Sequence, residues 1–274
     1  VVIGEGTLDE APMLYTGEIV GTEKGLNFDI AIDPVEGTNF VANNLPGSIS
    51  VLSIAEKGNL FKAPETYMNK IATGKIDKGL IDLDFPLKKN IKNLSEFKNK
   101  DISSLTVCLL DRPRHKKIID ELKELNVNLK LISDGDVLGA IYVSQPKYGV
   151  DMFLGIGGGP EGVIAASALD AYDCHFQGRF IFDNDKNMNE AKSMGIKDLD
   201  RKYDLNEIIK GDSIFCATGI TNSEILHGIV LDQNSYISET LITHKSSNLK
   251  KIIKKKNLID EWYQFLIKIG SKKK

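Results

Sequence analysis

Residues 29–38 read Asp29-Ile30-Ala31-Ile32-Asp33-Pro34-Val35-Glu36-Gly37-Thr38, an apolar strand pattern followed by a proline turn and a helix start. The strand is predicted to end at Asp33, where Pro34 stiffens the turn. Glu36 then returns to the same side, so that two carboxylates and the Thr38 hydroxyl converge. An Asp-Pro dipeptide alone usually marks only a turn. The full pattern directly after an apolar strand instead favours a site for Mg²⁺ or Mn²⁺, which prefer oxygen ligands.

The rest of the chain repeats this alternation of short strands and helices. β-Branched runs end in glycine or aspartate and pass into helical patterns, which is typical of an α/β fold. The predicted strands are residues 1–3, 28–32, 48–54, 104–110, 129–132, 152–155 and 213–218. The predicted helices are residues 10–20, 114–125, 136–142, 162–171, 187–194 and 249–267. A lysine-rich connector and helix at residues 82–103 is expected to mark a seam between subdomains.

The composition of the 274 residues, 42% hydrophobic and 27% charged, is that of an ordinary globular protein. Its net charge of -3 argues against a general nucleic-acid-binding protein, which needs a positive excess. No apolar stretch approaches the roughly 18 residues of a membrane span, so we expect no membrane partner and a cytoplasmic location. Three widely spaced cysteines predict buried, reduced thiols. The lysine-rich run 250–256 and the tail 270–274 are expected to be solvated surface.

A second acidic cluster follows the first predicted strand. Glu5 lies between Gly4 and Gly6, which allow the backbone to come close to a ligand. Glu5 is therefore a candidate metal ligand. Asp9 is either a functional carboxylate beside it or simply the N-cap of the helix that follows.

A glycine-rich loop joins the predicted strand at 152–155 to the predicted helix at 162–171, and it reads Gly155-Ile156-Gly157-Gly158-Gly159-Pro160-Glu161-Gly162. Backbone amides in such a loop can bind phosphate with the help of the helix dipole, although a tight turn explains the glycines equally well. An acidic residue there repels phosphate unless a cation lies between them, so Glu161 is another candidate metal ligand. The loop lacks both the Lys-Ser/Thr ending of a P-loop and the GxGxxG spacing, which argues against a nucleotide-binding module.

Polar residues also follow two other predicted strands. Arg112 and Arg114 come after the strand at 104–110, and they can hold a phosphate through paired N–H donors. Asp134 and Asp136 follow the strand at 129–132, where they can accept hydrogen bonds from sugar hydroxyls or cap the next helix. His115 is expected to be a surface histidine on the following helix.

These motifs, in this order, resemble the GlpX-type, class II fructose-1,6-bisphosphatases. The matching segments are residues 5–14, 33–39, 63–68, 111–115, 133–136, 157–162 and 217–221, which span nearly the whole chain. The resemblance implies the layered α-β-α-β-α fold of the lithium-sensitive phosphatase superfamily, rather than the plain doubly wound sheet that periodicity suggests. It also implies one sugar-phosphatase fold over residues 1–274, with a metal-binding half at about 1–100 and a substrate-binding half at about 101–274.

The resemblance further implies a reaction and a site. The reaction is removal of the 1-phosphate of fructose 1,6-bisphosphate by metal-activated water, which gives fructose 6-phosphate in gluconeogenesis. The implied ligands of Mn²⁺ or Mg²⁺ are Glu5, Asp33, Glu36 and Glu161. The implied substrate contacts are Glu36, Gly37, Thr38, Tyr67, Arg112, Pro113, Arg114, Asp134, Gly135, Asp136 and Gly158. Asp9, Thr38 and Glu5 are the expected catalytic residues, and a homo-oligomer is the expected assembly.

One departure from the family leaves alternatives open. The family has a further metal-ligating aspartate in a segment upstream of the position that is Val1 here, and the chain starts inside a strand pattern without methionine. We therefore expect an N-terminal truncation, and an inactive fragment or a regulatory remnant is one alternative. Sedoheptulose 1,7-bisphosphate and inositol monophosphates are alternative substrates. An inositol monophosphate would leave the pair of arginines redundant.

Overall fold

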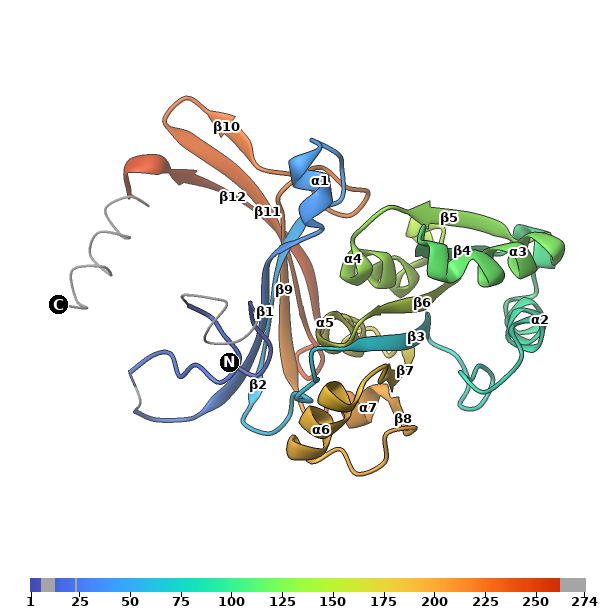
Figure 1. The fold of residues 1–274 in the computed structure, drawn as a ribbon. Coiled ribbons are helices and arrows are strands. Elements are labelled where there is room, and N and C mark those ends of the chain that lie inside the picture. Colours follow the sequence, from blue (N-terminus) through green and yellow to red (C-terminus); the bar gives the residue numbers. More distant parts are fainter. Residues whose placement is uncertain (6–12, 23, 262–274) are drawn as a thin grey trace.

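The computed structural model describes residues 1–5, 13–22 and 24–261, and Figure 1 shows two sheets with helices packed between them and against one outer face. The first sheet has six strands in the order β1-β2-β9-β11-β10, with β12 paired to β11. The second sheet has six strands in the order β5-β4-β6-β3-β7-β8. The predicted α/β class is confirmed.

The first sheet combines strands from the two ends of the chain. They are β1 (Phe28–Glu36), β2 (Ile49–Glu56), β9 (Ser213–Gly219), β10 (Val230–Asp232), β11 (Ser235–His244) and β12 (Leu249–Leu258). Neighbouring strands are antiparallel. Ile49, Val51, Ser53 and Ala55 of β2 are buried while the alternate residues Ser50, Leu52 and Ile54 are more exposed, because successive side chains of a strand point to opposite faces. The buried row faces the helices between the sheets.

The second sheet is formed by the middle of the chain. Its strands are β3 (Tyr67–Thr73), β4 (Thr106–Leu110), β5 (Asn128–Ile132), β6 (Met152–Gly158), β7 (His175–Ile181) and β8 (Lys202–Asp204). β4 is parallel to β5 and β6, and the other pairs are antiparallel. The sheets therefore do not divide at residue 100, because β9 to β12 return to the first sheet. The assignment of metal and substrate roles to two halves of the chain stays a prediction.

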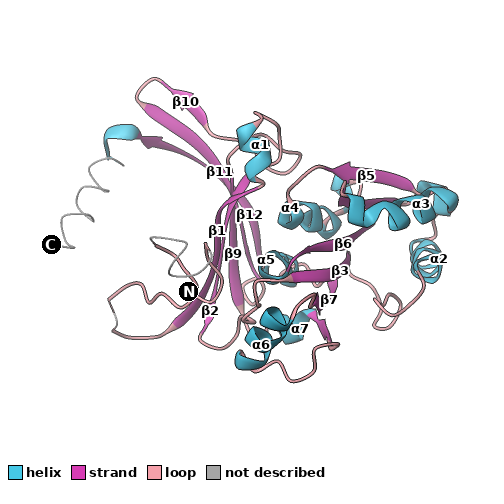
Figure 2. Cartoon of the chain, in the orientation of Figure 1, coloured by secondary structure: helices cyan, strands magenta, loops and turns pink. Residues whose placement is uncertain are grey.

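The described helices form two layers (Figure 2). They are α1 (Thr38–Ala42), α2 (Leu87–Lys98), α3 (Lys116–Glu124), α4 (Asp136–Ile141), α5 (Gly159–Asp170), α6 (Asp185–Ser193) and α7 (Leu205–Ile208). α4 and α5 lie between the sheets, and α2 and α3 cover the outer face of the second sheet. The described residues thus supply four of the five layers that the resemblance implies, in the order β-α-β-α.

α5 can lie between two sheets because of its residue types. Ten of its twelve residues are buried, so it is apolar all round, as expected for a helix with no solvent face. Gly162, Ala165, Ala166 and Ala168 keep it thin. Within the part of the chain that the structure describes, no helix is long and apolar enough to cross a bilayer.

Several predicted elements are wrong at the ends of the chain. Residues 13–20 of the first predicted helix are turn and coil, and its residues 10–12 lie outside the described part. Residues 1–3 form only one isolated bridge, from Ile3 to Ala31. Residues 249–258 are strand β12 instead of a helix, since they pair with β11 over their full length. The three cysteines are free thiols as predicted, although Cys216 is only half-buried.

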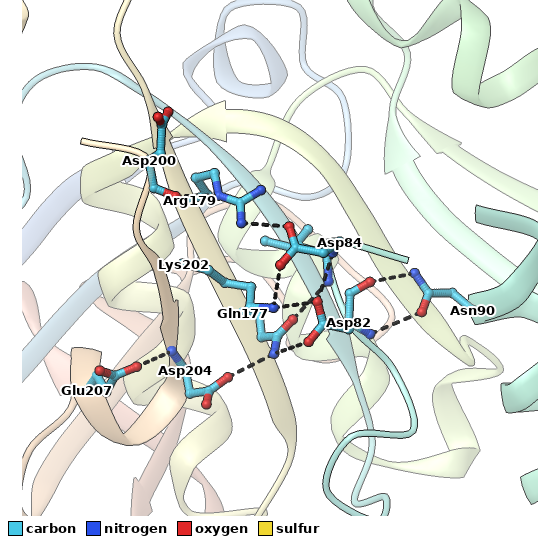
Figure 3. A network of polar contacts seen from close by, with 10 residues as sticks. Asp82, Asp84, Asn90, Gln177, Arg179, Asp200, Lys202, Asp204 and Glu207 are labelled. Atoms are coloured by element: carbon cyan, nitrogen blue, oxygen red, sulfur yellow. Dashed lines mark hydrogen bonds and ion pairs between the residues drawn. The ribbon is translucent and has the colours of Figure 1, made fainter. Parts of the chain in front are cut away.

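The connector before α2 is attached to the far edge of the second sheet by a polar network (Figure 3). Lys202 on β8 donates to Asp82 and Asp84, and Arg179 on β7 donates to Asp84 at 2.7 Å. Gln177, also on β7, donates to Asp204 at 2.9 Å and accepts from Leu83 N at 2.9 Å. The lysine-rich segment is therefore held by fixed contacts at its start.

His115 joins the ends of two strands in the second sheet. It lies in the 3₁₀ turn Pro113–His115 after β4 and is fully buried, so the prediction of a surface histidine was wrong. Its Nδ1 lies 2.7 Å from Leu110 O, and its Nε2 lies 2.7 Å from Ile156 N. Since a backbone N–H can only donate, Nε2 accepts and Nδ1–H donates, so the ring is the neutral tautomer. Burial lowers the pKa of His115.

This lowered pKa predicts a pH-dependent contribution to stability. At pH values between the folded-state and the unfolded-state pKa of His115, the unfolded chain binds more protons than the folded chain. His115 therefore costs no stability above about pH 6.5, and it destabilises the fold as the pH falls below that value. We expect a loss of up to about 1.4 kcal/mol per pH unit in this range. Denaturant unfolding at pH 7.5 and 5.5 should show it in the natural chain.

The matched variants are His115→Gln and His227→Gln, because His227 is exposed. The first should lessen the loss of stability between pH 7.5 and pH 5.5, and the second should leave that loss unchanged. An equal pH dependence in all three proteins would contradict the role of His115.

Candidate active site

One pocket of about 440 Å³ collects the strand ends of both sheets. β1 contributes from the first sheet, and β3, β4, β5 and β6 contribute from the second. The pocket is lined by Glu5, Asp33, Val35, Glu36, Gly37, Thr38, Tyr67, Leu110, Arg112, Arg114, Asp134, Asp136, Gly157, Gly158 and Glu161. Most of the residues expected from the sequence therefore lie together. Pro113 and Gly135 are neighbours of lining residues, and Asp9 lies outside the described residues.

The end of β1 places two carboxylates in this pocket. The register of β1 against β2 shifts between Asp33 and Glu36, so the strand is irregular where the proline turn was predicted. Asp33 accepts a hydrogen bond from Val35 N at 2.9 Å. Gly37 then takes φ = 79° and begins α1, a left-handed conformation in which a side chain would be strained.

Glu36 is buried with one carboxylate oxygen free of protein partners. Its Oε1 accepts from Val137 N, in the first turn of α4, at 2.8 Å. Its Oε2 is buried and has no hydrogen-bond partner among the described residues. Burial raises the pKa of Glu36 well above its ordinary value, and the nearby carboxylates Asp136, Asp33 and Glu161 raise it further. A buried, unpaired carboxylate oxygen is costly unless a proton or a cation satisfies it.

The other carboxylates show the same signs of crowding. Burial raises the pKa of Asp33 to about 6, and Glu5, Glu161 and Asp134 add to the increase. Burial also raises the pKa of Glu161, against the charge of Lys70, which lowers it. Crowded acids with raised pKa values are a common sign of a functional site.

The donor chemistry fits a hard divalent cation, but the side chains are not gathered as a finished cage. Every carboxylate in the pocket offers oxygen, which is what Mg²⁺ and Mn²⁺ prefer. Among the described residues, however, no three Asp, Glu, His or Cys side chains stand close enough to hold one ion together. A metal would therefore need side-chain movement, and the free Glu36 Oε2 is the atom that gains most from it.

Three glycines leave space for the ring of Phe40, which packs where α1 and α4 begin beside the pocket. Phe40 of α1 is buried, and a Cβ at Gly37, Gly47 or Gly135 would lie 2.8–3.0 Å from its ring. Gly135 has φ = 84° and precedes α4 directly. Asp134 lies one residue earlier, and its carboxylate accepts from Asn39 N of α1 at 3.2 Å. The starts of α1 and α4 are therefore held side by side.

Two arginines and a tyrosine form the cationic side of the pocket. Arg114 Nε donates to Ile156 O at 2.9 Å, and its guanidinium lies 5.0 Å from the centre of the Tyr67 ring. Arg112 Nη2 lies 3.6 Å from Asp134 Oδ1. Both arginines keep N–H donors beyond these contacts, because a guanidinium carries five.

The glycine loop differs from the expectation of a phosphate-binding row of amides. Gly159 N donates to Thr66 O at 2.8 Å, and Pro160 has no N–H. The Glu161 carboxylate accepts from its own backbone N–H. The glycines instead make room for acids, since a Cβ at Gly157 would overlap Asp136 and one at Gly158 would overlap Glu161. The amides of Gly159 and Glu161 are therefore already bonded within the protein, and a contact between Gly158 and phosphate stays a prediction.

Sequence reasoning missed two residues that shape this site, Lys70 and Phe40. Lys70 on β3 is 1% exposed, and its ammonium group donates to Asp136 and, at 2.8 Å, to Gly158 O. A lysine inside the apolar pattern of residues 67–73 was the available signal, because lysine is almost never fully buried without a partner. Phe40 carried no comparable signal.

Comparison with known proteins agrees with this geometry. The family described as bacterial fructose-1,6-bisphosphatase, glpX-encoded, matches residues 1–257. Three cyanobacterial proteins named D-fructose 1,6-bisphosphatase class 2/sedoheptulose 1,7-bisphosphatase are similar over most of the chain. The protein of Trichodesmium erythraeum is 38% identical over 92% of this chain and 81% of its own length. The protein of Synechococcus elongatus is 38% identical over 95% of this chain and 83% of its own length.

The third, from Prochlorococcus marinus, is 40% identical over 88% of this chain and 77% of its own length. The match to the family extends from Val1 through β11 and into β12, so it includes every pocket residue described above. The chain therefore belongs to the GlpX-type, class II fructose-1,6-bisphosphatase family.

Proposed function

We propose that this chain is a sugar bisphosphatase that removes the 1-phosphate of fructose 1,6-bisphosphate and releases fructose 6-phosphate and phosphate. The observation that supports it is the composition of one pocket, whose lining contains both carboxylates for a cation and two arginines for phosphate. Phosphate ester hydrolysis needs both kinds of group, since the anionic substrate must be bound and the charge of the transition state stabilised.

Glu5, Asp33, Glu36 and Glu161 are the residues that would hold Mn²⁺ or Mg²⁺. When bound, such an ion supplies a Lewis acid for the phosphoryl oxygens and lowers the pKa of a coordinated water. Glu36 Oε2 is buried without a partner among the described residues, and the pKa of Asp33 is raised. A cation would therefore stabilise the ionised forms of these two carboxyl groups most.

The chain's own polar groups would bind and orient the substrate. Arg112 and Arg114 offer paired N–H donors to the phosphates, and Tyr67 packs against the Arg114 guanidinium. Asp134 is held by Arg112 and by α1, and it faces the pocket as an acceptor for sugar hydroxyls. Thr38 at the start of α1, and Asp9 outside the described residues, are the candidates to orient or deprotonate the attacking water. The new O–P bond forms as the P–O bond to the sugar breaks, the attacking water loses a proton to the base, and the leaving sugar oxygen takes up a proton to become a hydroxyl.

Sedoheptulose 1,7-bisphosphate is the second candidate substrate, because the names of the three cyanobacterial relatives include it. Its reacting phosphate end differs little from that of fructose 1,6-bisphosphate. An inositol monophosphate is disfavoured by the presence of two arginines in one pocket. A homo-oligomer and a cytoplasmic location stay predictions.

The first test is hydrolysis itself. With Mn²⁺, the chain should release phosphate from fructose 1,6-bisphosphate, and EDTA should abolish the release. Glu161→Ala should lower kcat by on the order of 100-fold, as expected for loss of one group that stabilises the transition state.

Glu96→Ala is the matched control, because Glu96 is an exposed acid on α2 away from the pocket. It should keep full activity. Turnover that survives EDTA or Glu161→Ala would contradict the proposed chemistry. A correctly folded chain without any turnover would favour the alternative of an inactive fragment.

The second test is the pH dependence of metal binding. A proton on Asp33, whose pKa is about 6, competes with the metal, so Mn²⁺ affinity should fall about tenfold per pH unit below pH 6. The pKa of Asp33 is raised from 3.8 to about 6, so between these two pH values the metal-free folded chain binds more protons than the unfolded chain. The metal-free fold therefore loses stability as the pH rises through this range. Mn²⁺ should restore that stability above pH 6.

Calorimetric titration with Mn²⁺ at pH 5, 6, 7 and 8 measures the affinity, and thermal unfolding with and without Mn²⁺ measures the stability. Asp33→Asn should bind Mn²⁺ more weakly at pH 8 and with a smaller pH dependence. An affinity that is constant from pH 5 to pH 7 in the natural chain would exclude Asp33 as a ligand.

A further inference from the structure

The pocket has a strong excess of negative charge. Its lining includes six carboxylates, from Glu5, Asp33, Glu36, Asp134, Asp136 and Glu161. Among the described residues that line it, only Arg112 and Arg114 are cationic. Such a field attracts a metal ion but repels phosphate, and the repulsion is strong where protein replaces water. A phosphate-binding pocket of this kind therefore needs additional positive charge.

Lys70 places one such charge directly beneath the pocket. It is not a lining residue, it is 1% exposed, and it lies on β3 in the middle of the second sheet. Its ammonium group donates to the Asp136 carboxylate and to Gly158 O, both of which belong to the pocket wall. Gly162 packs closely against this region, since a Cβ there would lie 2.6 Å from Met68 Sδ and 3.3 Å from Lys70 Cδ.

The contacts of Lys70 restrict what it can do. Because it is buried beneath Asp136 and Gly158, it cannot reach a phosphate in the pocket, so it is not a direct ligand. Its charge nevertheless acts on the pocket acids, since it opposes the increase that burial causes in the pKa of Glu161. Asp136, for its part, is buried and bonded to Lys70, so its carboxylate is not simply an open acceptor for substrate.

We propose that Lys70 is a positioning residue and the internal counter-ion of the pocket, paired with Asp136, and that its charge permits an anionic phosphate to bind beside the carboxylates. The inference rests on the proposed bisphosphatase function and assigns the Lys70–Asp136 pair a part in it. Lys70 acts at all times, whereas a metal ion would neutralise the acids only when bound.

The test separates charge from mere packing by using two ligands of opposite sign. Lys70→Met keeps the length of the side chain and removes its charge. Calorimetric titration with inorganic phosphate and, separately, with Mn²⁺ should then show phosphate affinity reduced by about five- to tenfold and Mn²⁺ affinity equal or higher. If the role of Lys70 were purely structural, Lys70→Met would lower the affinity for both ligands, because a distorted pocket binds neither well.

A double variant makes the test stricter and guards against misfolding. Lys70→Met combined with Asp136→Asn removes both charges, so the net charge of the pocket region returns to that of the natural chain. Phosphate affinity should recover to within about twofold of the natural value. Asp136→Asn alone should raise phosphate affinity and lower Mn²⁺ affinity.

Lys98→Met is the matched control, because Lys98 forms an ion pair with the buried Asp151 away from the pocket. It should leave both affinities unchanged. Loss of affinity for both ligands in Lys70→Met, no change for either, or failure of the double variant to recover phosphate binding would overturn the proposal. None of these measurements needs turnover, so an inactive chain would refute the proposed function without deciding the role of Lys70.

Discussion

Burial of several carboxylates in one pocket, with their mutual repulsion added to it, is the constraint on which the structure around the pocket depends. Glu36 illustrates it most clearly, with one oxygen held by Val137 N and the other buried without a partner among the described residues. Carboxylates this close to one another cannot all ionise in a dry environment unless positive charge is supplied. Burial raises the pKa values of Asp33, Glu36 and Glu161, and the neighbouring carboxylates add to the increase. Burying these acids destabilises the metal-free fold. Binding of a cation and a phosphate is the function that fits their chemistry.

The architecture keeps these acids in place with small residues and buried polar contacts. α5 is thin enough to lie between two sheets, and Gly157 and Gly158 leave space for the carboxylates of Asp136 and Glu161. His115 fixes the arginine-bearing turn by two hydrogen bonds, one to Leu110 O at the end of β4 and one from Ile156 N of β6. Lys70 supports the same region from below. The pocket itself takes its lining from β1 of the first sheet and from strand ends of the second, so its geometry is determined by both sheets together.

Much of the site was predictable because it lies at strand ends that are marked by local sequence. The acids at the end of β1, the arginines after β4 and the aspartates after β5 were each recognisable from an apolar run followed by polar residues. β3 and β7 were missed, since central strands of a mixed sheet show no simple alternation. β12 was predicted as a helix, because Lys250 to Lys256 are exposed and only pairing with β11 makes them a strand. The burial of His115 and the role of Lys70 depend on residues more than 40 positions away, which no local pattern contains.

The central claim is that these carboxylates hold a divalent cation next to the phosphate of a sugar bisphosphate. The most direct measurement is anomalous diffraction at the manganese edge from crystals of this chain soaked with Mn²⁺ and fructose 1,6-bisphosphate. The account predicts a manganese peak in contact with Asp33, Glu36 and Glu161, with a phosphate group between that peak and Arg112 or Arg114. A manganese peak elsewhere in the molecule, or sugar phosphate bound in this pocket with no metal beside it, would contradict it.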